Sequence, residues 1–76
     1  MPVVELPARF GLVVRRARIS VGLSQEGLAA AAGLDRTYIS SLERGKRNPT
    51  LITQERIAAA LRRPLSVLVA EAEGLS

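Results

Sequence analysis

The 76-residue sequence contains no cysteine, no histidine and no tryptophan, and its aromatic residues are one phenylalanine and one tyrosine. Without cysteine there is no disulfide, and without cysteine and histidine the common zinc sites and a histidine general base are excluded. A glycine-rich phosphate loop and a paired-carboxylate cluster are also missing. We therefore expect a protein that is not an enzyme and that uses no metal or other cofactor.

Long hydrophobic runs are absent as well. No apolar stretch approaches the roughly 18 residues of a membrane-spanning helix. The start of the chain does not follow the pattern of a signal peptide, because Glu5, Pro7 and Arg9 interrupt it. These absences predict a cytoplasmic protein without a membrane partner, and no small-molecule ligand is evident.

The charge of the chain is strongly biased toward arginine. The net charge is +4, and the eleven basic residues are ten arginines and one lysine. Arginine suits bidentate contacts with phosphate and guanine better than lysine does. Nucleic acid is therefore the first partner to consider. The length predicts a single domain over residues 1–76, with a core so small that dimerisation is a plausible source of added stability.

The stretch over residues 23–49 predicts two short helices joined by a turn. Ser24 is a strong N-cap, and the helix that follows ends at Gly33, since glycine readily adopts the left-handed conformation. Asp35 is a second N-cap candidate, and the next run of helical spacing ends at Gly45. Two short helices with such a connection form a helix-turn-helix motif, here over about residues 24–45.

The second helix of this motif has a polar outer face, as expected of a recognition helix in the major groove. The predicted contacts with DNA bases are Arg36, Thr37, Ser40 and Ser41. Arg36 is the best candidate for base reading, because a guanidinium can bond both O6 and N7 of guanine while Asp35 is bonded to the backbone amides. The last three can also be simple solvent-facing residues.

A second set of residues surrounds the recognition helix and predicts contacts with the DNA backbone. The set is Gln25, Tyr38, Arg44, Lys46 and Arg47. Gln25 begins a helix, where its amide and the backbone amides favour phosphate, and the three cations form a basic exit loop. Tyr38 is either a DNA contact or a purely structural ring. For Arg9, Arg15 and Arg16 a solvated basic face is favoured over DNA contact.

The residues SQEGLAAAAGLDRTYISSLERGKRNPTL resemble the helix-turn-helix core of Cro/C1-type proteins, and DRTYISSLERGKRN is most similar to restriction-modification controller proteins. The resemblance implies an all-α fold, a compact lambda-repressor-like bundle of about five helices. It also implies a symmetric homodimer on double-stranded DNA that regulates transcription. In this family an arginine and a glutamate tie the first helix to the third, which here implies a structural ion pair of Arg18 and Glu43.

The remaining helices are expected at about residues 7–21, 53–61 and 64–72. Three positions depart from the family pattern: Ile52 replaces a capping Ser or Thr, Gln54 an apolar residue, and Arg62 a helix-ending glycine. The last helix is more apolar than one inward face requires, which predicts an interface. The residues predicted for that dimer interface are Val67, Val69 and Leu75.

The leading functional interpretation is a transcription regulator that binds a pseudo-palindromic operator as a dimer. It includes a restriction-modification controller protein and a small phage or plasmid repressor. Activator and repressor stay open, because the sign of regulation depends on where the operator lies. An antitoxin or protein-interaction module with the same fold is the alternative.

Overall fold

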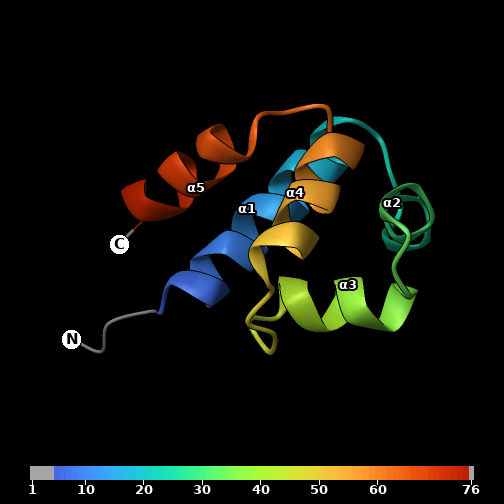
Figure 1. Ribbon diagram of the computed structural model, residues 1–76, viewed down its shortest axis with the longest axis horizontal. Coiled ribbons are helices and arrows are strands. Elements are labelled where there is room, and N and C mark those ends of the chain that lie inside the picture. The colour runs from blue at the N-terminus through green and yellow to red at the C-terminus, as the bar shows by residue number, and fades with distance from the viewer. Residues whose placement is uncertain (1–4, 76) are drawn as a thin grey trace.

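The computed structural model describes residues 5–75, and within this range it contains five helices and no strand. The helices are α1 (Leu6–Ser20), α2 (Gln25–Ala32), α3 (Arg36–Glu43), α4 (Leu51–Ala60) and α5 (Leu65–Gly74). Figure 1 shows α3 along the lower edge of the molecule, with α1, α4 and α5 above it. The predicted all-α bundle is confirmed, and its recognition helix lies at the surface of the bundle.

Local chemistry sets the bounds of α2 as expected. The Ser24 hydroxyl accepts a hydrogen bond from the Gly27 backbone N–H at 2.9 Å, which satisfies one of the free amides of the first turn. Gly33 ends the helix with φ +70°, in the left-handed region that glycine enters without steric cost. The first helix lies one residue earlier at each end than expected.

The start of α4 differs from the prediction. The helix begins at Leu51 rather than Thr53, because Thr50 is the N-cap and its hydroxyl accepts from the Thr53 backbone N–H at 3.1 Å. Ile52 is therefore not at a capping position but in the exposed first turn. A threonine two residues earlier performs the capping that the family pattern assigns to position 52.

The connection from α4 to α5 also differs in detail. Pro64 is the N-cap of α5 rather than a residue of its first turn, and the helix continues to Gly74 instead of ending at Ala72. Arg62 adopts φ +57°, the left-handed conformation for which the family uses glycine. A side chain at this conformation costs roughly 1–2 kcal/mol. The backbone at position 62 thus has the left-handed conformation of the family although the residue is arginine.

All five helices contribute to one buried apolar cluster. Its largest fully buried side chains are Val13, Val14, Leu28, Ile39, Leu42, Ile57, Leu61 and Leu68. The backbones of α1 and α3 approach each other closely, because a Cβ added at Gly11 would collide with the Leu42 carbonyl oxygen. This contact fixes α3 against α1 and leaves the opposite face of α3 open. No helix in residues 5–75 is long and apolar enough to cross a membrane.

Candidate nucleic-acid interface

The recognition helix α3 divides its side chains between the core and the surface. Ile39 and Leu42 are fully buried, whereas Arg36 and Thr37 at its start are exposed. Ser40 and Ser41 are half-buried, so a smaller part of each side chain is accessible than for the residues of the first turn. The outer face of α3 is therefore most accessible at its N-terminal end, which is where a helix in the major groove meets base edges.

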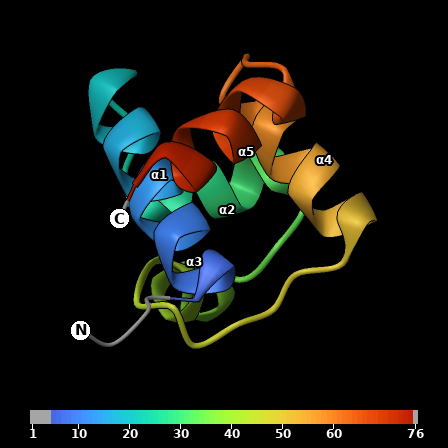
Figure 2. The same ribbon diagram turned by 90° about the vertical axis from the view of Figure 1, so that its left-hand side faces the viewer.

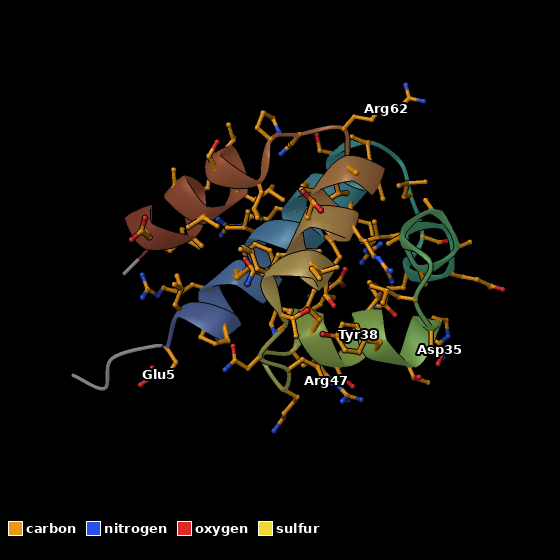
Figure 3. All side chains as sticks on the ribbon, in the orientation of Figure 1. Glu5, Asp35, Tyr38, Arg47 and Arg62 are labelled. Atoms are coloured by element: carbon orange, nitrogen blue, oxygen red, sulfur yellow. The ribbon has the colours of Figure 1, made fainter. Side chains whose placement is uncertain are left out.

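Arg36 is held at this end by a neighbour from α2. Its Nη1 donates to Gln25 Oε1 at 3.4 Å, a long bond between two residues that each begin a helix. Asp35 makes no side-chain capping bond, contrary to the expectation that it is bonded to the backbone amides. Its carboxylate is exposed, and Figure 3 labels Asp35 beside the start of α3. Solvent competes well for a carboxylate so placed, and α3 begins without a side-chain cap.

The amide nitrogen of Gln25 also bonds within the protein. Its Nε2 donates to Glu43 Oε1 at 3.0 Å, so this amide bonds a carboxylate at the end of α3. One N–H of the amide group is left for a phosphate, and the predicted backbone contact stays a prediction. The two bonds of Gln25 connect the start of α3 with its end.

Arg18 and Glu43 form a bidentate ion pair between α1 and α3. The distances are 2.7 Å from Nε to Oε2 and 3.0 Å from Nη2 to Oε1, and Arg18 Nη1 also donates to the Leu23 carbonyl at 2.9 Å. The side chains are only 11% and 3% exposed. The bond to Glu43 raises the pKa of Arg18, so the guanidinium stays charged at physiological pH.

These contacts join into one polar network, which runs from Arg18 through Glu43 and Gln25 to Arg36 and ties α1, α2 and α3 together. Nothing in the local sequence pattern of Gln25 indicates that it bonds Glu43, because the two residues are 18 positions apart. The sequence signal that could have related Gln25 to α3 is the helix-turn-helix motif itself, because α2 begins with Gln25, α3 begins with Arg36, and the two helices cross at the turn. Among the described residues, no buried side-chain polar atom lacks a hydrogen bond.

The basic exit loop follows α3 directly. Arg44, Lys46 and Arg47 are exposed, and the Arg47 guanidinium lies 5.0 Å from the centroid of the Tyr38 ring. Figure 3 shows Tyr38 and Arg47 side by side along the edge that α3 forms. Tyr38 is half-buried and its ring packs against the core, while the predicted contact of its hydroxyl with DNA stays a prediction. A stacked cation of this kind is worth about 0.5–1 kcal/mol at an exposed site. The stacking holds the loop beside the recognition helix.

Three further arginines, Arg9, Arg15 and Arg16, lie on α1. Arg9 is half-buried and its Nη1 donates to the carbonyls of Ala72 and Leu75, at 3.1 and 3.2 Å. The expectation of a solvated face is wrong for Arg9, because its guanidinium satisfies carbonyl groups at the end of α5. Arg15 and Arg16 are exposed on α1.

Fewer apolar residues of α5 are left outside the core than the sequence predicts. Val69 and Leu75 are half-buried and pack against the core, whereas Val67 is 42% exposed. The sequence analysis predicted that all three residues lie outside the core. In the structure α5 packs along α1 through a wider apolar face than a single helical stripe. Only Val67 remains largely free for a partner.

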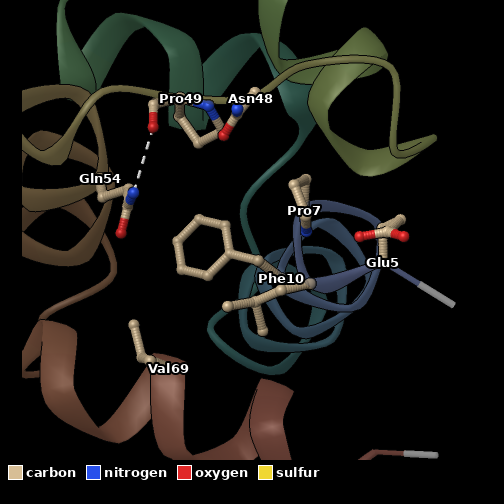
Figure 4. A pocket seen from close by; sticks show the side chains of 8 residues that line it. Glu5, Pro7, Phe10, Asn48, Pro49, Gln54 and Val69 are labelled. Atoms are coloured by element: carbon tan, nitrogen blue, oxygen red, sulfur yellow. Dashed lines mark hydrogen bonds between the residues drawn. The ribbon is translucent and has the colours of Figure 1, made fainter. Parts of the chain in front are cut away.

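A cleft of about 380 Å³ lies beside the exit loop, as Figure 4 shows. Phe10 forms part of its wall, and Gln54 reaches across from α4 to donate to the Pro49 carbonyl at 3.1 Å. The polar residue at position 54 thus anchors the loop before α4 instead of filling the space as an apolar residue would. Residues 5–75 contain no group of three or more side chains that could hold a metal ion.

A helix-turn-helix whose second helix lies open at the surface, with exposed arginine at its start and three cations after its end, defines a DNA-binding domain. The Helix-turn-helix family model HTH_3 matches residues 14–68, and the chain belongs to this family of Cro/C1-type proteins.

The relatives with known roles include restriction-modification controller proteins. Control protein C.MunI from Mycoplasma sp. is 44% identical over 70 residues, which cover 91% of this chain and 95% of that protein. Control protein C.BamHI from Bacillus amyloliquefaciens is 51% identical over 68% of this chain and 65% of its own length. The crystal structure of the controller protein C.AhdI from Aeromonas hydrophila has 43% identity and a TM-score of 0.79, over 80% of this chain and 92% of that one.

Proposed function

We propose that this protein is a sequence-specific, double-stranded DNA-binding transcription regulator of the restriction-modification controller type. The observation that carries the proposal is the accessible face of α3, with Arg36 held at its start by Gln25. The similarity to C.MunI over nearly the whole chain supports it. Binding of DNA requires neither a cofactor nor an enzymatic step, and it places the protein in the cytoplasm with its operator.

Base reading falls to the exposed end of α3. Arg36 uses one N–H on Gln25, and a guanidinium has five N–H groups, so enough donors remain to bond O6 and N7 of one guanine. Thr37 is the other exposed residue of the first turn, and Ser40 and Ser41 lie further along the same helix. Their hydroxyls can contact either a base or a phosphate.

Phosphate binding falls to the exit loop and to the start of α2. Arg44, Lys46 and Arg47 are exposed and follow the recognition helix, where they neutralise the backbone on one side of the groove. The amides of the first turn of α2, with the second N–H of Gln25, suit a phosphate on the other side. Phosphate contacts on both sides orient α3 without reading sequence.

A homodimer completes the proposal. A twofold axis relates two recognition helices so that they enter successive major grooves about 34 Å apart, and the operator is then a pseudo-palindrome. Val67, the exposed residue of α5, is one candidate for the contact between copies, with Val69 and Leu75 behind it.

Selection of duplexes from a random library with the wild-type protein tests the proposal. We expect enrichment of a pseudo-palindrome with a guanine at the same place in each half, and binding that weakens steeply as salt rises. The Arg47→Ala variant should weaken the selected and the random duplex alike, because a phosphate contact carries no sequence information. No enrichment, together with binding that does not respond to salt, would count against DNA as the partner.

A further inference from the structure

A hollow of about 460 Å³ lies at the end of the molecule away from α3. It forms where the connection from α1 to α2 meets the connection from α4 to α5. Figures 1 and 2 both show the connection from α4 to α5 at the upper end and α3 at the lower end. The residues that line this hollow, called the far-end hollow below, are Val21, Leu23, Ala31, Ala60, Leu61 and Arg62.

Exposed apolar side chains lie in and beside the far-end hollow. Val21 in its wall is 46% exposed, and Ile19, near the end of α1, is 58% exposed. Neither side chain belongs to the buried core, to which this part of α1 contributes Ala17. Apolar surface that stays in contact with water around a hollow typically marks a binding site for a partner.

The charged groups at the far-end hollow are positive. Arg62 lines the hollow, and Arg63 beside it donates to the Ser20 hydroxyl at 3.5 Å. A neighbouring hollow shares Ala31 with the first and is lined by Arg56. Of the described residues that line these two hollows, none is a carboxylate. An occupant that supplies carboxylates would therefore be attracted to this end.

Arg62 has two unusual properties at this site. It adopts φ +57°, a conformation that costs a side chain roughly 1–2 kcal/mol and that glycine would adopt freely. Within residues 5–75 its guanidinium makes no hydrogen bond or ion pair, although its backbone N–H closes the turn on the Ala59 carbonyl at 3.1 Å. The fold thus uses the backbone of Arg62 and not its side chain. Strain of this kind is typical of residues that serve binding.

The chemistry of the hollow distinguishes between possible occupants. A twofold contact centred on it would bring Arg62 close to its own equivalent, which disfavours a second copy of this chain. Duplex DNA presents phosphate and sugar, which an apolar wall does not match. A lipid surface has no side chain to fill a hollow. A protein segment with an apolar residue between carboxylates satisfies both the wall and the guanidinium, which pairs with a carboxylate through two parallel bonds.

We propose that the far-end hollow is a docking site for an acidic segment of a partner protein. An apolar side chain of that segment enters the hollow against Val21, and its carboxylates bond Arg62 and the free N–H groups of Arg63. The inference goes beyond the proposed function. Figure 3 shows Arg62 pointing away from the molecule at the end opposite α3, so the partner and DNA can be bound at the same time.

Selection from a display library of random peptides tests the proposal on the full chain in the absence of DNA. We expect the wild-type protein to enrich peptides that combine aspartate or glutamate with a large apolar residue. A fluorescein-labelled synthetic copy of the most enriched peptide then gives a Kd by fluorescence anisotropy. A Kd of about 1–100 µM is expected for so small an interface.

Three variants show where this peptide binds. Arg62→Gly removes the guanidinium and relieves the positive φ, so the fold is retained, and we expect it to raise the peptide Kd at least about fivefold. Val21→Asp, which adds a carboxylate to the wall, should have a similar effect. Arg47→Ala is the charge-matched control, because it removes an equal charge from the DNA-binding edge. It should change the peptide Kd less than about twofold. Circular dichroism and thermal melting verify that each variant is folded.

A duplex selected by the wild-type protein should leave the peptide bound. Displacement of the peptide by the duplex, or its loss in Arg47→Ala, would place the peptide on the DNA-binding surface and overturn the inference. Selection without enrichment of acidic peptides would overturn it too, as would equal affinity of the peptide for the wild type, Arg62→Gly and Val21→Asp. A protein that binds the peptide in the far-end hollow and binds no DNA would instead refute the proposed function and leave the docking site standing.

Discussion

Arg36 is the residue on which sequence reading depends in this account. It is exposed, it opens the recognition helix, and its Nη1 makes a long hydrogen bond of 3.4 Å to Gln25 Oε1. A side chain that is oriented before binding loses less conformational entropy when it bonds a base. The bond to Gln25 is one contact that orients Arg36 in this way.

Replacement of Arg36 separates base reading from phosphate binding. Arg36→Ala should weaken binding to the selected operator by about 10- to 100-fold and binding to random duplex much less, because a bidentate guanine contact is worth about 1–3 kcal/mol. Arg36→Lys should restore charge but not the two parallel bonds. Fluorescence anisotropy with the operator, a guanine-substituted operator and random duplex measures these losses.

The control for charge alone is Arg62→Ala, which removes an exposed arginine at the end of the molecule opposite α3, as Figure 3 shows. It should leave the ratio of operator to random binding unchanged. Parallel losses for Arg36→Ala on all three duplexes, with rescue by lysine, would instead make Arg36 a phosphate contact and move sequence reading to Thr37, Ser40 or Ser41.

Arg18 belongs to the fold rather than to the DNA surface. Because the Arg18 and Glu43 side chains are 11% and 3% exposed, Arg18→Ala leaves a nearly buried carboxylate with only Gln25 as its side-chain partner, and we expect a loss of about 3 kcal/mol of unfolding free energy. Urea denaturation measures this loss. Arg16→Ala, on the same helix but exposed, should stay within about 0.5 kcal/mol of the wild type. Equal effects of the two changes would mean that the ion pair contributes nothing.

The sequence predicted single residues well where one residue type suits one environment. The exposed start of α3 followed from helical spacing, and the family pattern implied that Arg18 and Glu43 would meet. Asp35 shows the limit, because capping is worth only about 1 kcal/mol and a solvated carboxylate competes with it. The bond from Gln25 to Glu43 depends on how α2 crosses α3, which no local pattern contains.

At the scale of helices, the crossing of α1 and α3 decides where the recognition helix points. Gly11 lies against the Leu42 carbonyl, so the two backbones are closer than any side chain would permit. Leu42 is fully buried on the inner face of α3. A shift of α1 would therefore tilt α3 and move Arg36 with it.

Gly11→Ala should lower the unfolding free energy by about 1–3 kcal/mol, the typical cost of overpacking a filled core. Gly27→Ala, also inside a helix, should change the unfolding free energy by less than about 1 kcal/mol, since the gain in helix propensity is offset by a tight contact of the added Cβ with the Ser24 hydroxyl, 3.2 Å away, which caps α2. Thermal melts of the two variants provide the comparison. A Gly11→Ala protein as stable as Gly27→Ala would contradict the close approach of α1 and α3.

Helix positions could be predicted because apolar spacing and caps are local signals. The start of α4 was misplaced because the family pattern sets the cap at position 52, whereas the structure shows that Thr50 is the cap. The inward face of α5 was predicted too narrow. Val69 and Leu75 are covered because α5 lies along α1, and the width of such a contact depends on how two helices dock rather than on either sequence alone.

At the scale of the whole molecule, the surfaces divide by chemistry. The edge formed by α3 and the exit loop is cationic, the first turn of α4 is apolar with one carboxylate, and the far end around Arg62 is apolar with arginine. A cationic edge beside a nearly neutral apolar side fits a protein that binds a polyanion as a symmetric pair.

The most direct test of the central claim is the specificity ratio of the wild-type protein, which is its Kd for a random duplex divided by its Kd for the selected operator at physiological salt. A regulator that reads bases through α3 should give a ratio of at least about 10³, within the range typical of specific DNA-binding proteins. A ratio near one would contradict the account, because it would mean that the arginines of this surface bind the DNA backbone without reading its sequence.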